Sequence, residues 1–235
     1  MTVDFDHYAI AEKLILTYDQ LSRRSYPVHS KVPGFEGNPK ILGSICLDLS
    51  IDGEFVETFR SFCTREPKIF ALDCEMIQTS YLTKSVGKVA VVDINGKRIL
   101  EEILFPNDPM YYMSKKTRYY EENFTVKSFK KLQNKLCNII GVNDILVGHA
   151  LQGDLRALKL RHPKIVDTRT LYEDVSSPKS LKSLAVVYLG ENIQRSKRKH
   201  DPVEDFRASM SLFKKFCVKS KAKVIKDQEH PSSIS

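Results

Sequence analysis

The 235-residue sequence has no tryptophan, and its five cysteines include no Cys-x-x-Cys pair. An odd number of cysteines without such spacing argues against a disulfide framework and a cysteine-bound zinc site, and fits a reducing compartment. No apolar run approaches the ~18–20 residues that cross a bilayer. The first residues also lack the basic region and the apolar core of a signal peptide. We therefore expect no membrane partner and no secretory leader.

What the sequence does contain is enough apolar material for a core, and a surplus of positive charge. Hydrophobic residues make up 42% and charged residues 28% of the chain, which excludes a broadly disordered protein. The formal net charge is +8. Such a balance favours an anionic partner, of which nucleic acid is the commonest. A soluble protein that is merely basic fits the charge equally well.

The pattern of residues divides the chain into three parts. These are an N-terminal extension over 1–66, a main domain over 67–218 and a polar basic tail over 219–235. In the extension we expect a helix, a loop rich in proline and glycine, and strands, over 6–24, 26–40 and 41–60. Thr17 and Gln20 have the spacing of a capping box. Because the extension has apolar periodicity, we expect part of it to be ordered.

The main domain alternates between strand and helix patterns. Strands are predicted over 68–74, 88–94, 99–105, 145–148 and 165–167, and helices over 125–140, 151–161, 180–189 and 202–218. Asn95-Gly96 lies between the second and third strands and is a strong hairpin signal. The strands first form a meander and then alternate with helices. This order predicts an α/β fold with a mixed central β-sheet flanked by helices.

Two carboxylates end the first strand of the main domain. Asp73 and Glu75 are two residues apart, so a strand places both on one face. Close carboxylates repel each other, and an apolar strand carries such a pair mainly where a cation neutralises it. Mg²⁺ and similar hard ions prefer oxygen ligands of this kind. An ordinary strand-end pair remains the alternative interpretation.

A third carboxylate, Asp154, falls in the first turn of a predicted helix. Acidic residues there often only satisfy the helix dipole, and alone Asp154 favours that interpretation. His149 precedes it by five residues, the same spacing that separates His200 from Asp205. We interpret His149 as a structural residue that forms hydrogen bonds in the turn.

The last predicted helix begins with a run of polar residues. Asp201 suits the N-cap, Pro202 the first helical position and Glu204 the third position of a capping box, so these three have a structural role. His200 and Asp205 do not. Both can point toward the same end of the helix, which makes them candidates for chemistry.

Together these residues predict a phosphoryl-transfer site. Four carboxylates can hold two divalent ions that stabilise the attacking and leaving oxygens of an in-line displacement. A histidine with an ordinary pKa of ~6.5 can accept the proton of the attacking water. The candidate ligands are Asp73, Glu75, Asp154 and Asp205, and the candidate base is His200. A basic surface around an acidic pit suits a polyanionic substrate.

The same residues resemble the DEDDh 3′–5′ exonucleases of the RNase H-like superfamily, and within them the eukaryotic RNA exonuclease (REX) family. The matching segments are 71–76, 89–96, 145–149, 154–160, 166–168, 180–185 and 200–205. The resemblance implies that Asp73, Glu75 and Asp205 bind a catalytic ion directly and that Asp73 bridges to a second ion. It also implies that Asp154 holds the second ion through water and that His200 is the general base. The ions would be Mg²⁺ or Mn²⁺.

The resemblance also implies contacts with the substrate. Met76 would wedge near the terminal nucleotide, and Arg118 would face the substrate strand. The basic run 195–199, with Lys197, Arg198 and Lys199, precedes His200 and is interpreted as a loop that grips phosphates. A nuclear-import signal and a solvated loop are the alternatives. Four tyrosines could stack on bases or be ordinary core and surface residues, namely Tyr111, Tyr112, Tyr119 and Tyr120.

The sequence as a whole therefore predicts a metal-dependent 3′–5′ exoribonuclease. Its partner would be the single-stranded 3′ end of an RNA, such as a precursor of rRNA or tRNA, and its products nucleoside 5′-monophosphates. A DNA exonuclease with the same site is one alternative, because sugar recognition depends on pocket geometry. A catalytically silent RNA-binding relative is the other. The expected location is the nucleus, with the cytoplasm also open.

Overall fold

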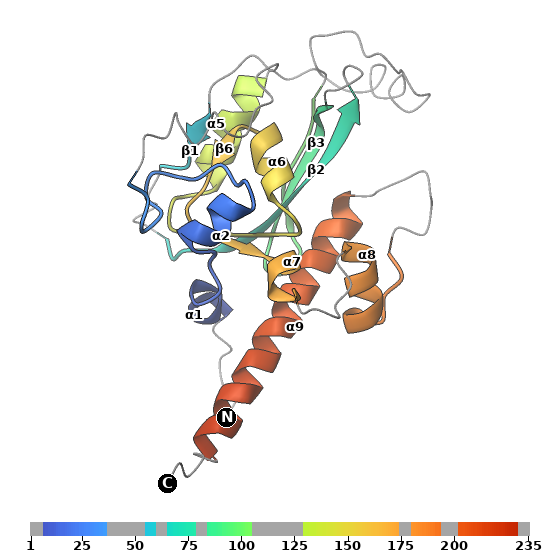
Figure 1. Cartoon of the computed structure of the whole chain (residues 1–235). Coiled ribbons are helices and arrows are strands. Elements are labelled where there is room, and N and C mark those ends of the chain that lie inside the picture. The colour runs from blue at the N-terminus through green and yellow to red at the C-terminus, as the bar shows by residue number, and fades with distance from the viewer. Residues whose placement is uncertain are drawn as a thin grey trace.

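The computed structural model describes residues 7–36, 55–59, 65–78, 84–104, 129–173, 180–193 and 202–229. At the centre of these residues is a five-stranded mixed sheet in the order β4-β3-β2-β5-β7 (Figure 1). The strands are β2 (Ile69–Gln78), β3 (Lys84–Asp93), β4 (Arg98–Ile103), β5 (Ile145–Gly148) and β7 (Ile165–Asp167). Pairing is antiparallel from β2 through β4 and parallel from β2 through β7. The hairpin predicted at Asn95-Gly96 is confirmed, with Gly96 at a φ of 79°.

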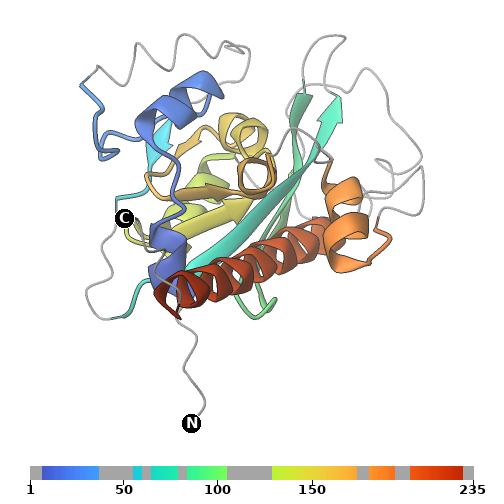
Figure 2. The same cartoon turned by 60° about the horizontal axis from the view of Figure 1, so that its bottom comes forward.

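Helices cover both faces of this sheet. The long helix α9 (Pro202–Glu229) crosses one face together with α1 (His7–Glu12), as Figure 2 shows. The other face carries α2 (Tyr18–Arg23), α5 (Phe129–Ile139) and α6 (Gln152–Ala157). Short helices α7 (Thr168–Leu171), α8 (Leu181–Leu184) and the π-helix η1 (Ala185–Leu189) adjoin α9. The layered α/β fold with a mixed sheet is therefore confirmed.

Three helix predictions differ from the structure. The single helix expected over 6–24 is two helices, and the predicted capping box at Thr17 begins the second of them. The helix expected over 151–161 ends at Ala157. Lys159 has a φ of 47°, and Leu160–Arg161 forms strand β6, parallel to β1 (Val56–Glu57).

The third difference lies at the C-terminal end of the chain. Helix α9 continues to Glu229, so the tail expected from residue 219 is helical over its first part. Between Val203 and His230 the sequence contains no proline or glycine, and it is rich in lysine, which favours helix. None of the helices in the described ranges is long and apolar enough to span a bilayer.

The described part of the N-terminal extension packs directly on the sheet layers. The Leu16 N–H donates to the Ile165 carbonyl, 2.9 Å away, and Leu21 and Tyr26 are buried in the same core as α5 and α6. On the opposite face, the Tyr8 hydroxyl donates to the Asn143 carbonyl at 2.7 Å. Residues from the extension and the main domain therefore share one hydrophobic core.

Candidate active site

Strand β2 extends beyond its parallel neighbour and leaves an edge on which the site is built. Its pairing with β5 runs from Ile69 to Ala71, so the following residues lie past the end of the β5 ladder. Asp73 and Glu75 both come before a β-bulge at Glu75/Met76. Bulges of this kind occur next to active sites, where they redirect side chains. The end of a parallel strand pair is also the usual position of a ligand site in an open α/β sheet.

Helix α6 brings Asp154 to this edge. The Asp154 carboxylate accepts hydrogen bonds from the backbone N–H and the thiol of Cys74, the residue between the two β2 carboxylates. The turn that leads into α6 is tight, because a Cβ on Gly148 would lie 2.8 Å from Leu151 Cδ1. Only glycine fits at that position without moving the Leu151 side chain. Asp154 therefore lies beside Cys74, between the positions of the two β2 carboxylates.

Helix α9 brings Asp205 to the same end of β2. Asp205 is buried in the first turn of α9, which begins at Pro202 as predicted. The next residue, Phe206, belongs to the cluster that includes Ala71 on β2. Because Asp73 follows Ala71 by two residues, it lies on the sheet face that α9 covers.

The pKa values of Asp73 and Asp154 reflect burial and the negative charges nearby. Burial raises the pKa of Asp73 to about 8, and the negative charges of Asp154, Asp205 and Glu75 contribute to this rise. Burial also raises the pKa of Asp154 to about 7, although its hydrogen bonds to Cys74 oppose the shift. At Asp73 the neighbouring negative charges oppose ionisation, and a bound cation would offset them.

A buried hydrogen-bond network supports the turn before α6. The Tyr26 hydroxyl donates to Asp167 Oδ2 at 2.5 Å, and Asp167 Oδ1 accepts the N–H of Ala150 and of Arg169, both at 2.9 Å. Ala150 has a φ of 55°, a strained value for a residue with a side chain. Asp167 therefore fixes the turn that presents Asp154, and Tyr26 fixes Asp167.

Two histidines of the main domain have structural contacts. His149 Nδ1 lies 3.1 Å from the Thr168 hydroxyl, which itself donates to the Gly148 carbonyl at 3.0 Å. His162 is fully buried between Thr58 and the Asp144 carbonyl, and burial lowers its pKa to about 4. Our interpretation of His149 as a residue of the turn agrees with this contact.

The other predicted site residues have different outcomes. Met76 is half-buried and packs against the core that contains α5 and α6. Outside the described residues lie His200, Arg118, Lys197, Arg198, Lys199 and the four tyrosines Tyr111, Tyr112, Tyr119 and Tyr120. Sequence reasoning gave no role to Cys74, Tyr26 or Asp167. The signal for Asp167 was its position at the end of a buried strand.

The donor set suits a hard divalent cation. All four candidate ligands offer carboxylate oxygens, which Mg²⁺ and Mn²⁺ prefer. Burial and the charges of the other carboxylates oppose the ionisation of Asp73, and a bound cation would offset both effects. Within the described ranges, no three His, Cys, Asp or Glu side chains form a ready-made metal site. Repulsion among the carboxylates is a physical reason for them to stay apart without a cation.

Comparison with known proteins gives relatives over most of the chain. RNA exonuclease 1 of Saccharomyces cerevisiae is 35% identical over 209 residues, which are 86% of this chain and 34% of that protein. RNA exonuclease 5 of Rattus norvegicus is 30% identical over 210 residues, which are 87% of this chain and 25% of that protein. The chain thus spans about a third or less of the length of these relatives. No protein-family model matches the sequence.

Solved structures show the same fold. The Pan2 catalytic unit of Neurospora crassa, which contains a protease and a nuclease domain, superposes with a TM-score of 0.59 and 18% identity. The match covers 79% of this chain and 33% of that one. The Pan2 module of Saccharomyces cerevisiae in complex with AAUUAA RNA gives a TM-score of 0.55 and 17% identity, over 73% of this chain and 33% of that one.

The order of the sheet and the helices on its two faces define an RNase H-like fold, as in the Pan2 nuclease structures. Exonucleases of this fold generally use divalent metal ions. The chain is homologous to members of the RNA exonuclease (REX) family, to which it is 30–35% identical.

Proposed function

We propose that this chain is a metal-dependent 3′–5′ exoribonuclease. The observation that carries the proposal is the convergence of carboxylates from β2, α6 and α9, with the Asp73 pKa raised by burial and by the charges of Asp154 and Asp205. A structural acidic cluster would gain nothing from this repulsion. Homology to proteins named RNA exonucleases supports the same activity.

Asp73, Glu75 and Asp205 are the proposed direct ligands of a divalent ion, and Asp154 is proposed to hold a second one through water. Bound Mg²⁺ or Mn²⁺ would supply positive charge for the attacking and leaving oxygens of an in-line displacement. The protein keeps the ligands in place through buried helices and strands, and Asp167 holds the turn that precedes Asp154. The apolar surroundings strengthen every charge interaction within the site.

Residues outside the described ranges complete the proposal. His200 lies two residues before α9 and five before Asp205, and it is the proposed general base for the attacking water. Arg118 and the run of Lys197, Arg198 and Lys199 are proposed to contact the substrate strand. Met76 is proposed to pack against the terminal nucleotide.

The proposed substrate is the single-stranded 3′ end of an RNA, and the products are nucleoside 5′-monophosphates. Relatives named RNA exonucleases and a Pan2 module solved with RNA favour RNA over DNA. We also propose a nuclear location, for which the basic run 195–199 is the support in the sequence.

The test uses matched RNA and DNA strands with a 5′ label, incubated with Mg²⁺, with Mn²⁺ or with EDTA. We expect the RNA to shorten one nucleotide at a time from its 3′ end with either ion, and to stay intact with EDTA. Asp205→Asn is the matched inactive variant. Faster trimming of DNA would replace this proposal with a DNA exonuclease. Binding of RNA without any cleavage in the presence of either ion would replace it with a silent RNA-binding protein.

A further inference from the structure

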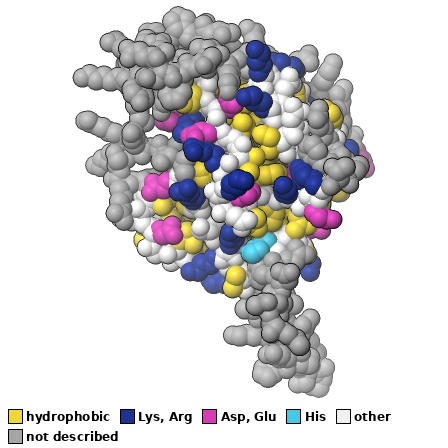
Figure 3. All heavy atoms as spheres, turned by 180° about the vertical axis from the view of Figure 1, so that it is seen from behind, with side chains coloured by type: hydrophobic (Ala, Val, Ile, Leu, Met, Phe, Trp, Pro, Cys, Tyr) yellow, Lys and Arg dark blue, Asp and Glu magenta, His cyan; other side chains and the backbone are white. Residues whose placement is uncertain are grey.

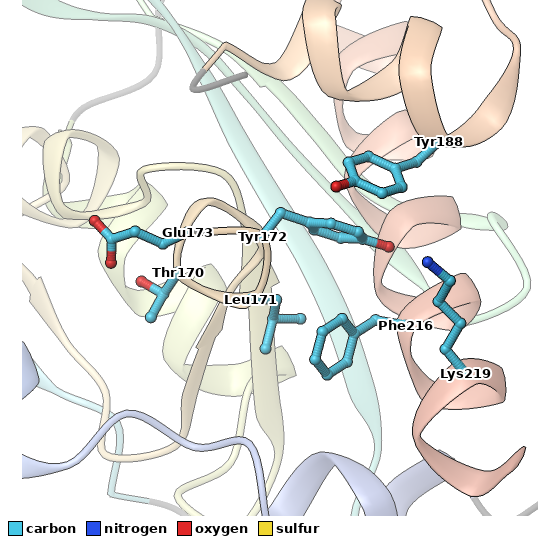
Figure 4. Close-up of a pocket in the computed structure, with 7 residues that line it drawn as sticks. All are labelled: Thr170, Leu171, Tyr172, Glu173, Tyr188, Phe216 and Lys219. Carbon is cyan, nitrogen blue, oxygen red and sulfur yellow. The ribbon is translucent and has the colours of Figure 1, made fainter. Parts of the chain in front are cut away.

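An open pocket lies on α9 beyond the catalytic carboxylates. It has a volume of about 360 Å³ and is lined by residues of α7, η1 and α9 and by the two residues after α7 (Figure 4). Its aromatic wall comes from Tyr172 after α7, Tyr188 in η1 and Phe216 in α9, and Lys219 stands at its side. None of these residues belongs to the carboxylate site.

The aromatic rings are held in a fixed arrangement. The Tyr172 ring lies between the other two, 4.4 Å from Tyr188 and 5.6 Å from Phe216 by ring centroids. Tyr172 is itself anchored, because its hydroxyl donates to the Leu212 carbonyl at 2.9 Å. Lys215 donates to the Tyr188 carbonyl and so ties η1 to α9. Tyr188 and Phe216 remain half-buried and keep aromatic surface toward the pocket.

A positive charge, that of Lys219, adjoins this aromatic surface, and the acidic lining residue Glu173 is paired with Arg24. Lys219 Nζ lies 5.4 Å from the centroid of the Tyr188 ring and is exposed. From Phe206 to Lys226 helix α9 contains no acidic residue, and its basic residues are Arg207, Lys214, Lys215, Lys219, Lys221, Lys223 and Lys226. Aromatic rings on which a base can stack, next to a cation that can pair with a phosphate, are typical of single-stranded nucleic-acid binding. An apolar peptide segment would gain no binding energy from the Lys219 charge.

The pocket is close enough to the carboxylates to serve the same strand. Helix α7 connects the two places, since Thr168 at its start contacts His149 in the turn before α6 and Tyr172 follows its end. Along α9, Phe216 follows Asp205 by eleven residues, which is roughly 16 Å at about 1.5 Å per residue. A strand with its 3′ end at the carboxylates covers that distance within a few nucleotides.

We propose that this pocket binds a base of single-stranded RNA a few nucleotides upstream of the 3′ end, with Lys219 at an adjoining phosphate. The assignment deepens the proposed exoribonuclease function and rests on it for the position of the 3′ end. It predicts that the protein distinguishes long from very short RNA, because only a longer strand reaches both the carboxylates and the aromatic rings.

The test measures binding of fluorescent oligouridylates in EDTA, where no cleavage occurs. Tyr188→Ala should weaken binding of a decanucleotide by about fivefold to a hundredfold, the range expected for one stacked base. It should leave binding of a trinucleotide unchanged, and Tyr188→Phe should bind like the wild type. Lys219→Ser should reduce the salt slope for the decanucleotide by about 0.7, whereas Lys214→Ser on the same helix should not. Circular dichroism checks the fold of each variant.

A cross-link locates the base directly. A photoreactive uridine placed at successive positions from the 3′ end should label Tyr188 from one upstream position. Equal losses for both oligonucleotides, or unchanged binding in Tyr188→Ala, would overturn the assignment. If the RNA cross-links to Tyr188 but no RNA is cleaved with metal present, the pocket assignment stands and the nuclease proposal fails. If RNA is trimmed and Tyr188→Ala binds RNA normally, the nuclease proposal stands and the pocket assignment fails.

Discussion

Tyr26 shows how one residue of the N-terminal segment can affect chemistry at the carboxylates. Tyr26 and Asp167 are both 2% exposed, and burial keeps the Tyr26 pKa far above its ordinary value, so the Tyr26 hydroxyl stays a donor to Asp167. Tyr26→Phe should cost about 1.5–3 kcal/mol of stability, the range for a hydrogen bond to a charged group. It should also lower kcat several-fold, because Asp167 holds the turn before Asp154.

Denaturant unfolding and initial rates measure these two effects. Tyr8→Phe is the matched control, since its hydroxyl donates to Asn143 away from the carboxylates. It should cost stability and leave kcat unchanged. If Tyr26→Phe and Tyr8→Phe lowered kcat equally, the effect would be general loosening of the fold and not the positioning of Asp154.

The two equally spaced histidines make a second prediction at this scale. His200→Ala should slow turnover by about 10²–10⁴-fold, the usual contribution of a general base. His149→Ala should instead lose about 0.5–1.5 kcal/mol of stability, because its ring forms a hydrogen bond with Thr168. Rates and unfolding curves of both variants separate the roles. A larger loss of rate in His149→Ala, with its fold intact, would reverse the assignment.

Among the elements, the sequence predicted the ones with a strong period and missed the ones set by tertiary contacts. The apolar run of β2 and the hairpin at Asn95-Gly96 came directly from the residues, as did the start of α9 at Pro202. Strand β6 could not be predicted, because two residues pair with β1 far away in sequence. The bond between Tyr26 and Asp167 spans 141 residues and has no local pattern either.

The residues of the candidate site also divide into those that the sequence predicted and those that depend on tertiary contacts. The four carboxylates could be chosen because Asp73 and Glu75 form a close pair that a cation would neutralise, and because Asp154 and Asp205 offer further oxygen ligands. Their mutual position depends on packing, such as the contact of Phe206 with the strand face that carries Ala71. Cys74 has no chemical signature in the sequence, and its hydrogen bond to Asp154 follows from the length of β2 beyond β5.

The basic run before α9 gives a prediction about an element. Lys199 adjoins His200, so the run is tethered near the scissile phosphate if His200 is the base. Replacing Lys197, Arg198 and Lys199 by Ser should flatten the salt dependence of RNA binding by roughly one to two units of slope. KM should rise more than kcat falls, since these charges hold the strand alike in the ground and transition states. An unchanged slope would leave an import signal or a solvated loop, and a localisation assay of the same variant would distinguish them.

For the whole molecule, the net charge of +8 is not by itself a binding surface. On the face shown in Figure 3, lysine and arginine side chains are mixed with acidic and hydrophobic ones. The α9 stretch from Phe206 to Lys226 differs, because it carries basic residues without acidic ones. The proposed contact of Lys219 with RNA therefore rests on the local charge of α9 and not on the total charge.

The buried carboxylates should also make the stability of the metal-free protein depend on pH. The Asp73 pKa is about 8 in the folded protein against an ordinary 3.8, so the folded state binds the extra proton. The stability that protonated Asp73 contributes is fully present below its pKa in the unfolded chain, and it is lost as the pH rises from about 4 to 8. Asp154, with a pKa of about 7, acts in the same direction. The melting temperature of the metal-free protein should therefore fall as the pH rises from about 4 to 8, and it should fall less in Asp73→Asn.

Divalent ions should reverse this loss. Because the carboxylates must release protons to bind a cation, Mg²⁺ or Mn²⁺ should raise the melting temperature more at about pH 8 than at about pH 6. Thermal unfolding with and without the ion measures the difference. A metal-free protein that is equally stable at both pH values would contradict the shared burial of these groups.

If carboxylates from β2, α6 and α9 form one site for divalent cations, a calorimetric titration with Mn²⁺ at about pH 8 should show it without any substrate present. Asp73→Asn and Asp205→Asn should each lose most of the binding heat, although the two residues come from different elements. Asp227→Asn, farther along α9, should bind like the wild type. Unchanged Mn²⁺ affinity in a folded Asp205→Asn variant would contradict a single shared site.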